Sequence, residues 1–178
     1  MYEQPSQPSL ASLFGTVIIF MVVVGYGFMA LNTEDAIWFI SKFEETPQEM
    51  VVFCYGTEKA IPAGSVQFNA LTALVNEQIS GTKNWDSLSM SDETYAHYQN
   101  GTDIMVLELR YAPTVRIHSI YKYFSNVGAL VIPLDGRHAK THAVFGRTGD
   151  VFTAGSLHIE KLSPMQEYLA SQGICVKP

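Results

Sequence analysis

Charge is missing from the first part of this chain, because residues 4–33 contain no Asp, Glu, Lys or Arg. Within them, residues 13–31 read LFGTVIIFMVVVGYGFMAL, and only Thr16 and Tyr26 carry polar groups. A helix of about 20 residues crosses the ~30 Å hydrocarbon layer of a bilayer. A buried helix of a soluble core rarely runs so long without an ionisable group. The sequence therefore predicts a transmembrane helix over residues 11–33.

Basic residues are also missing before this run, since residues 1–10 (MYEQPSQPSL) contain neither Lys nor Arg. A cleaved signal peptide would show a basic start, a shorter apolar stretch and a small-residue cleavage site. Phe28-Met29-Ala30 is a poor match to such a site, so an uncleaved signal-anchor is the better interpretation. The tail is expected to be disordered. No basic cluster follows the helix, which favours an extracytoplasmic C-terminal domain.

The sequence lacks the familiar motifs of nucleotide and redox chemistry: G-x-G-x-x-G, Walker A and C-x-x-C are all absent. Residues 44–103 hold nine acidic and two basic side chains, whereas residues 104–162 hold four acidic and seven basic ones. A nucleic-acid-binding protein would show a basic stripe along its surface. These absences predict no nucleic-acid partner and no cofactor, and make an enzyme less expected than a binding protein.

Cysteine is scarce, with Cys54 and Cys175 alone in 178 residues. In an extracytoplasmic domain the two could form one disulfide that closes a long loop. Cys54 falls in an apolar strand pattern, however, where a buried free thiol is common. The free thiol is the favoured interpretation. A thiol nucleophile is disfavoured, because no turn or helix N-terminus near Cys54 would activate it.

Aromatic residues follow the predicted anchor, in the segment AIWFISKF at residues 36–43. Trp and Phe at this position suit the headgroup region of a bilayer. We therefore interpret residues 34–46 as an interfacial or linker segment, with a continuation of the anchor helix along the membrane surface. The alternative is a first core-packing helix of the soluble domain.

Residues 47–178 are enough for one compact domain with its own core. Strand-like runs gather in the second half of this region, and helical patterns lie on either side of them, so the predicted fold class is α+β with a mostly antiparallel sheet and about three helices. A turn at Ala112-Pro113-Thr114 is expected to form a hairpin, and Gly149-Asp150 a second one. Pro133 is expected to place its strand at an edge or to end it. The expected helices cover residues 65–81, 91–101 and 163–173, with Ser163 as N-cap of the last, and the expected strands cover residues 50–55, 104–111, 115–118, 129–134, 142–148 and 151–162.

Two groups of side chains are candidates for ligand or partner binding. The hairpin at Pro113 would place Arg110 opposite Arg116, an unfavourable like-charge pair unless the register shifts or an anion lies across that face. The second group is Arg137, His138 and His142, in a short loop rich in polar groups. Two histidines four residues apart suggest a metal site, but Asp-Gly before them predicts a turn and no third ligand is suitably spaced. No metal site is therefore predicted.

The predicted span also contains small residues. Gly15 lies four residues after Ala11, and Gly25 and Gly27 flank Tyr26. Small residues allow close packing between membrane helices, although Gly is frequent in such spans in any case. These glycines are candidates for helix packing.

The expected function is that of a single-pass membrane protein whose domain binds other proteins, as an accessory or assembly subunit of a larger membrane complex. Its partners would be the lipid bilayer and other membrane-protein subunits. The alternative is a membrane-anchored enzyme or a sensor of a small anionic ligand.

Overall fold

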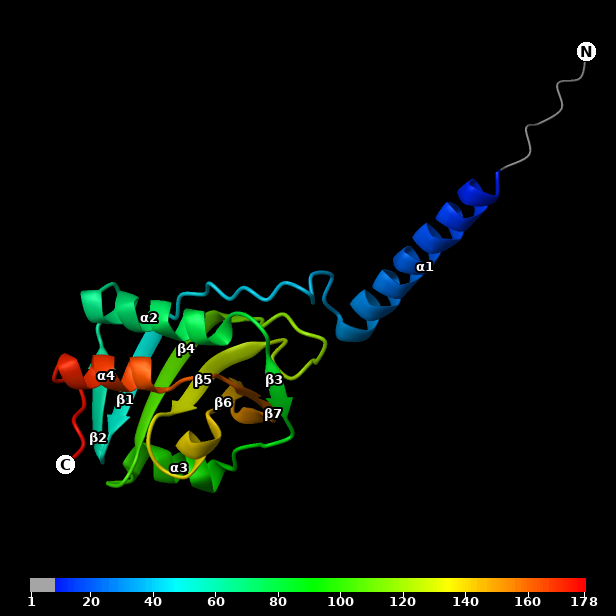
Figure 1. Ribbon diagram of the computed structural model, residues 1–178. Coiled ribbons are helices and arrows are strands. Elements are labelled where there is room, and N and C mark those ends of the chain that lie inside the picture. The colour runs from blue at the N-terminus through cyan, green and yellow to red at the C-terminus, as the bar shows by residue number, and fades with distance from the viewer. Residues whose placement is uncertain (1–8) are drawn as a thin grey trace, which may run out of the picture.

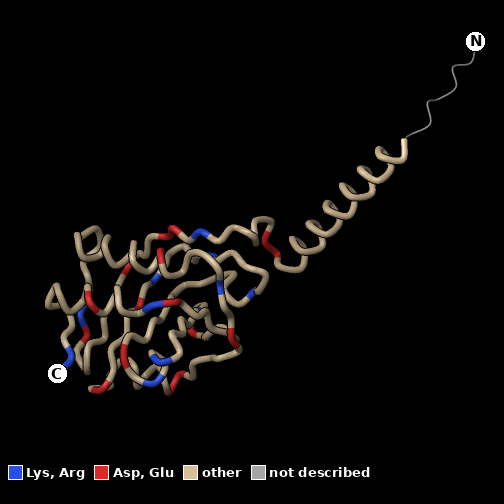
Figure 2. Tube along the Cα trace, viewed as in Figure 1, with Lys and Arg blue, Asp and Glu red and all other residues tan. Residues whose placement is uncertain are grey.

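The computed structural model describes residues 9–178, so the predicted disordered tail lies almost entirely outside the described part. Helix α1, Leu10–Thr33, has Ser9 as its N-cap, and the side chain of Ser9 accepts a hydrogen bond from the backbone N–H of Ser12. The helix is long and apolar enough to span a membrane, and none of its most hydrophobic window is buried inside the protein. It extends away from the domain as a single rod without charged residues (Figures 1 and 2).

Helix α1 ends at Thr33 and does not continue into the aromatic segment at residues 36–43. Glu34 adopts a left-handed backbone conformation with φ of 54°, which turns the chain out of the helix. Residues 36–39 then form a turn, and no helix or strand occurs between them and residue 49. The predicted interfacial extension of the helix is therefore wrong, as is the alternative of a separate core-packing helix.

The domain that follows is α+β, as predicted from the sequence, and contains one antiparallel seven-stranded sheet and three further α-helices. The strands lie in the spatial order β2-β1-β4-β5-β6-β7-β3. Their bounds are β1 Glu49–Cys54, β2 Thr57–Ile61, β3 Asn84–Asp86, β4 Met105–Val115, β5 Val127–Pro133, β6 Ala143–Thr148 and β7 Val151–His158.

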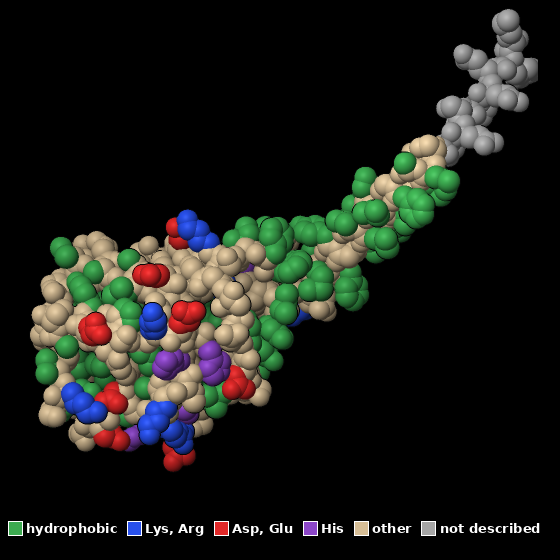
Figure 3. All heavy atoms as spheres, viewed as in Figure 1, with side chains coloured by type: hydrophobic (Ala, Val, Ile, Leu, Met, Phe, Trp, Pro, Cys, Tyr) green, Lys and Arg blue, Asp and Glu red, His purple; other side chains and the backbone are tan. Residues whose placement is uncertain are grey.

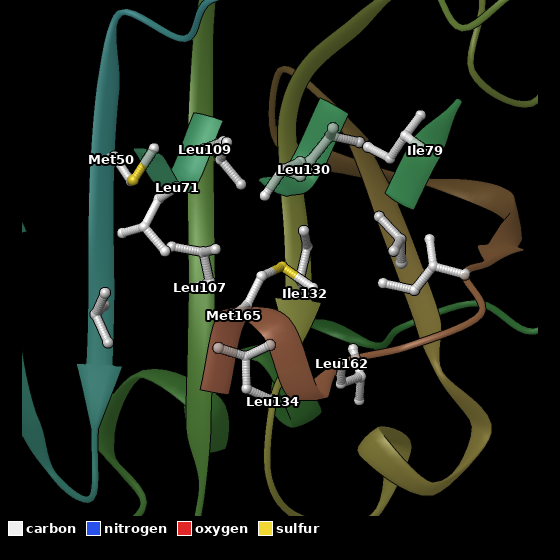
Figure 4. Packing of buried hydrophobic residues seen from close by; sticks show 14 of the residues in the cluster. Met50, Leu71, Ile79, Leu107, Leu109, Leu130, Ile132, Leu134, Leu162 and Met165 are labelled. Carbon is white, nitrogen blue, oxygen red and sulfur yellow. The ribbon is translucent and has the colours of Figure 1, made fainter. Parts of the chain in front are cut away.

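Both faces of the sheet are covered. Helices α2 (Val66–Ile79) and α4 (Ser163–Ser171) pack on one face, where leucine, isoleucine and methionine side chains from helices and strands interdigitate (Figure 4). Helix α3 (Asp92–Asn100) contributes its tyrosines to a second, smaller cluster on the other face. Alternation along β4 explains the two clusters, because neighbouring side chains point to opposite faces of a strand.

The predicted turn at residues 112–114 is wrong. Strand β4 continues through these residues to Val115, which pairs with Val127 of β5. The register shifts between Arg110 and Val115, so a bulge takes up the intervening residues. Pro113 lacks a backbone N–H and is tolerated at such a bulge. The hairpin around Gly149-Asp150 is confirmed as β6 and β7.

Two other predictions from the sequence, for Pro133 and for the start of α4, differ in part from the structure. Strand β5 lies at the centre of the sheet, and Pro133 is its last residue, so the proline ends the strand and does not mark an edge. Helix α4 has Leu162 as N-cap without a side-chain hydrogen bond, so the predicted cap by Ser163 is wrong. Its Gln166 instead donates to the carbonyl oxygen of Leu134.

A disulfide joins Cys54 at the end of β1 to Cys175 after α4, and this corrects the favoured interpretation of a free buried thiol. The two Cα atoms are 5.7 Å apart, within the usual range for a bridge. Both residues are buried in the core on the α2 and α4 face. The bridge excludes Cys54 as a nucleophile in this state.

Candidate functional site

Helix α1 presents apolar side chains on every side, and no other part of the described chain packs against its three glycines. A Cβ atom added at Gly15, Gly25 or Gly27 would meet nothing within 4 Å. At 3.6 residues per turn, Gly25 and Gly27 point about 200° apart and flank the side taken by Tyr26. The Tyr26 hydroxyl donates a hydrogen bond of 2.7 Å to the carbonyl oxygen of Ala36, so that side of the helix faces the segment that follows it.

Two polar contacts fix the end of α1 to the domain. Asp35 is buried, and its Oδ2 lies 2.8 Å from Nδ1 of His118, in the loop between β4 and β5. Its other oxygen accepts a hydrogen bond of 3.0 Å from the backbone N–H of Ile37. Lys122 in the same loop lies 2.7 Å from Glu34. The junction is therefore a folded part of the protein.

Electrostatics agree with this geometry. The hydrogen bond from Lys122 lowers the pKa of Glu34, and its positive charge adds to the effect, as does that of Arg116. Lys83, just before β3, donates to the carbonyl oxygen of Ser41 at 2.8 Å. Partial burial lowers the pKa of Lys83. The basic groups at the junction are thus largely used within the protein.

Arg110 belongs to a different place, on the α3 face of the sheet. Its Nε donates to Glu108 at 2.7 Å, and its Nη1 lies 3.3 Å from Glu49. Glu108 is buried and also accepts a hydrogen bond of 2.6 Å from Tyr95. Burial and this hydrogen bond raise the pKa of Tyr95 to about 12, and Glu108 raises that of Arg110. The cluster satisfies its own charges.

The structure does not bring Arg110 and Arg116 together. Arg110 is paired with Ala129 across β5, whereas Arg116 lies beyond the bulge, on the side of Glu34. The expected like-charge face is absent because the strand does not turn at Pro113. No anion is needed to explain it.

Arg137 and His138 lie next to α3. The Tyr98 hydroxyl and His138 Nδ1 are 2.7 Å apart and share a hydrogen bond. His138 is buried against Phe145, with ring centroids 5.2 Å apart. Burial lowers the pKa of His138, and the charge of Arg137 lowers it further. The exposed Arg137 borders a hollow of about 410 Å³, together with Tyr98, Glu93, His97 and Asp103.

His142 lies apart from His138, despite their closeness in sequence. The 3₁₀ helix His138–Thr141 ends at His142, which has a φ of 52° and points into a separate hollow of about 360 Å³ lined also by Lys140 and Glu160. Within residues 9–178, no group of three His, Cys, Asp or Glu side chains could hold a metal ion. The five polar candidates therefore occupy four separate places.

Sequence reasoning missed the contacts that organise the molecule. Asp35 and His118 are 83 residues apart, and neither occurs in a recognisable motif. Tyr55 donates to Asp135 at 2.8 Å, and Lys177 near the C-terminus contacts the same carboxylate at 2.8 Å. The hydrogen bond from Lys177 lowers the pKa of Asp135.

Comparison with known proteins gave no match: no family model, no curated protein and no solved structure is similar to the chain.

Proposed function

We propose that this is a single-pass membrane protein that holds its α+β domain outside the cytoplasm and binds other membrane proteins, as an accessory or assembly subunit. The observation that carries the proposal is the surface of α1. Its apolar side chains are exposed along the whole length of the helix, so the rest of the described chain does not cover them. A lipid bilayer would cover these side chains and remove their apolar surface from water, which is favourable.

The disulfide supports the side of the membrane. Disulfides persist in oxidising compartments and are rare in the cytosol. The bridge between Cys54 and Cys175 lies within the domain, and no basic cluster follows α1 to hold the domain in the cytosol. An N-in, C-out arrangement fits both observations.

The open space at the glycines of α1 supports binding to other membrane helices. Close backbone approach needs small residues, and Gly15, Gly25 and Gly27 provide it on more than one side of the helix. Crosslinking in native membranes followed by purification in mild detergent tests this. We expect Gly25→Leu to reduce crosslinked complexes strongly, and Val23→Leu, a matched change on the same helix, to leave them intact. A monodisperse monomer without crosslinked partners would reject the proposal.

A small-ligand function has one observation in its favour, the hollow beside Arg137. It combines the exposed guanidinium of Arg137 with Tyr98, whose hydroxyl shares a hydrogen bond with His138 behind the hollow's wall. Inorganic phosphate is a suitable probe, and Arg137→Ala should abolish its binding without affecting folding, because Arg137 is exposed. Glu93 and Asp103 line the same hollow and oppose an anion, so this is the second candidate.

A further inference from the structure

The domain carries an apolar surface of its own where α1 joins it. Ile37, Phe39 and Ile40 after the helix are exposed by 42%, 59% and 38%, and Ile120 and Tyr121 in the loop between β4 and β5 by 49% and 46%. We call residues 37–40 together with residues 119–121 the juxtamembrane surface. Figure 3 shows the hydrophobic side chains of α1 continuing onto the adjoining part of the domain.

The two halves of this surface are distant in sequence but held side by side. The contact between Asp35 and His118, at 2.8 Å, joins the segment after the helix to the start of the loop. Trp38, Ile40 and Ile120 line one shallow hollow of about 180 Å³. Both halves thus belong to one surface.

The loop is firmly supported from behind. Phe124 is fully buried, and its ring centroid lies 5.1 Å from that of Trp85 in β3. Tyr121 stacks on Tyr123 at 5.7 Å with nearly parallel rings. The backbone N–H of Ile117 donates to the carbonyl oxygen of Phe124 at 2.9 Å, which closes the loop. Ile120 and Tyr121 are therefore held on the surface by a fixed scaffold.

Elsewhere on the domain, large exposed hydrophobic side chains are single. Among the described residues, these isolated side chains are Val66 at the start of α2, Val151 at the start of β7 and Val176 near the C-terminus. Scattered apolar side chains are normal on a protein surface, whereas a contiguous group indicates a contact. The contiguous group lies at the one point where the chain would leave the bilayer.

We propose that the juxtamembrane surface inserts into the headgroup layer of the bilayer and fixes the domain in one orientation on the membrane. This rests on the proposed function in one respect, that α1 spans the bilayer. Because α1 and the surface are continuous, lipid meets the surface as soon as the helix is inserted. Isoleucine and aromatic rings favour this boundary. Strand β2 and the C-terminus lie at the opposite end of the domain, where other proteins have access (Figure 1).

Hydrophobic insertion, and not attraction to anionic lipid, is the expected mode. Lys122 is paired with Glu34, whose pKa Arg116 also lowers, Lys42 is paired with Glu44 at 2.7 Å, and Lys83 with a backbone carbonyl. A bilayer of phosphatidylcholine alone, without anionic lipid, should therefore be enough for the juxtamembrane surface to insert. Contact should also persist in roughly 1 M salt, where the Debye length is only ~3 Å.

The test uses the full chain in phosphatidylcholine nanodiscs without other proteins. Single cysteines are introduced by Phe39→Cys and Ile120→Cys, and the controls are Val66→Cys and Val151→Cys. Each is labelled under non-reducing conditions with a polarity-sensitive fluorophore. Nitroxides on the lipid headgroup or upper acyl chain then act as quenchers for these four labels, and a nitroxide near the end of the acyl chain quenches a label at Val22→Cys, which reports whether α1 is inserted.

We expect the labels at residues 39 and 120 to lose most of their emission, and those at residues 66 and 151 to lose little. Equal quenching at all four positions, or none at residues 39 and 120 while residue 22 is quenched, would overturn the inference and leave the anchor in place. Failure of quenching at residue 22 would instead refute the transmembrane helix. Labels shielded in native membranes but not in nanodiscs would show that a protein covers this surface, which also overturns the inference.

Discussion

Removal of the disulfide between Cys54 and Cys175 should cost the domain a large part of its stability. The bridge closes a loop with a sequence separation of 121 residues. In the chain-entropy description, a loop of roughly 120 residues corresponds to about 5 kcal/mol at 25 °C, an upper figure because unfolded chains retain structure. We expect a loss of about 3–5 kcal/mol in the free energy of unfolding for Cys54→Ala/Cys175→Ala.

The assay is denaturant unfolding of the full chain in mild detergent, monitored through the near-ultraviolet circular dichroism of the domain. For a chain of this size, such a loss lowers Tm by roughly 6–20 °C. Wild-type protein with reductant is the matched control, since it keeps both sulfur atoms in the core and loses only the bond. A loss below about 1 kcal/mol in both samples would refute the reasoning, because the loop-closure term would then be absent.

Three further predictions concern the polar contacts. Glu108→Ala leaves the charge of Arg110 without its buried partner, and should lower the free energy of unfolding by about 2–4 kcal/mol, less than for a fully buried pair because the Arg110 side chain is 42% exposed; an unchanged denaturation midpoint would contradict this. The pKa of His138 in the folded protein lies below its ordinary 6.5, so the unfolded chain binds the proton more readily. The contribution of neutral His138 to stability is therefore fully present above about pH 6.5, and the free energy of unfolding should fall as the pH drops below that value. In a series of unfolding midpoints measured against pH, His138→Gln should reduce this fall. A His138→Gln series as steep as the wild-type one would exclude His138 as the cause. His118→Ala should release the segment after α1 from the loop and speed limited proteolysis there, with a stability cost of about 2–4 kcal/mol because the buried Asp35 carboxylate loses its partner; unaltered cleavage would show that Asp35 is held by other contacts.

The sequence predicts the elements whose signals are local. Helix α2 was predicted over residues 65–81, and the structure confirms it as Val66–Ile79, with Ser65 as its N-cap. Strands β2 and β3 were not predicted, because β2 (TEKAI) is exposed along most of its length at the edge of the sheet and β3 has three residues. Neither presents the alternating pattern on which strand prediction depends.

The candidate site was predictable only in part, for a physical reason. Its organising contacts join residues that the fold brings together over long distances in the chain, such as Asp35 with His118 and Tyr98 with His138. Arg110 illustrates the opposite error. It attracted attention as half of a like-charge pair with Arg116 in a hairpin that does not form, whereas Glu108, two residues away on the same face, neutralises it. The alternation of a strand places both on one side, and that signal was available in the sequence.

The most direct test of the account is protease protection of the full chain in sealed vesicles whose cytosolic face is outward. We predict that the chain stays in the membrane pellet after alkaline carbonate extraction and that added protease leaves the disulfide-bonded domain intact until detergent is added. Release into the supernatant would contradict a transmembrane α1. Digestion of the domain in sealed vesicles would contradict its position outside the cytoplasm.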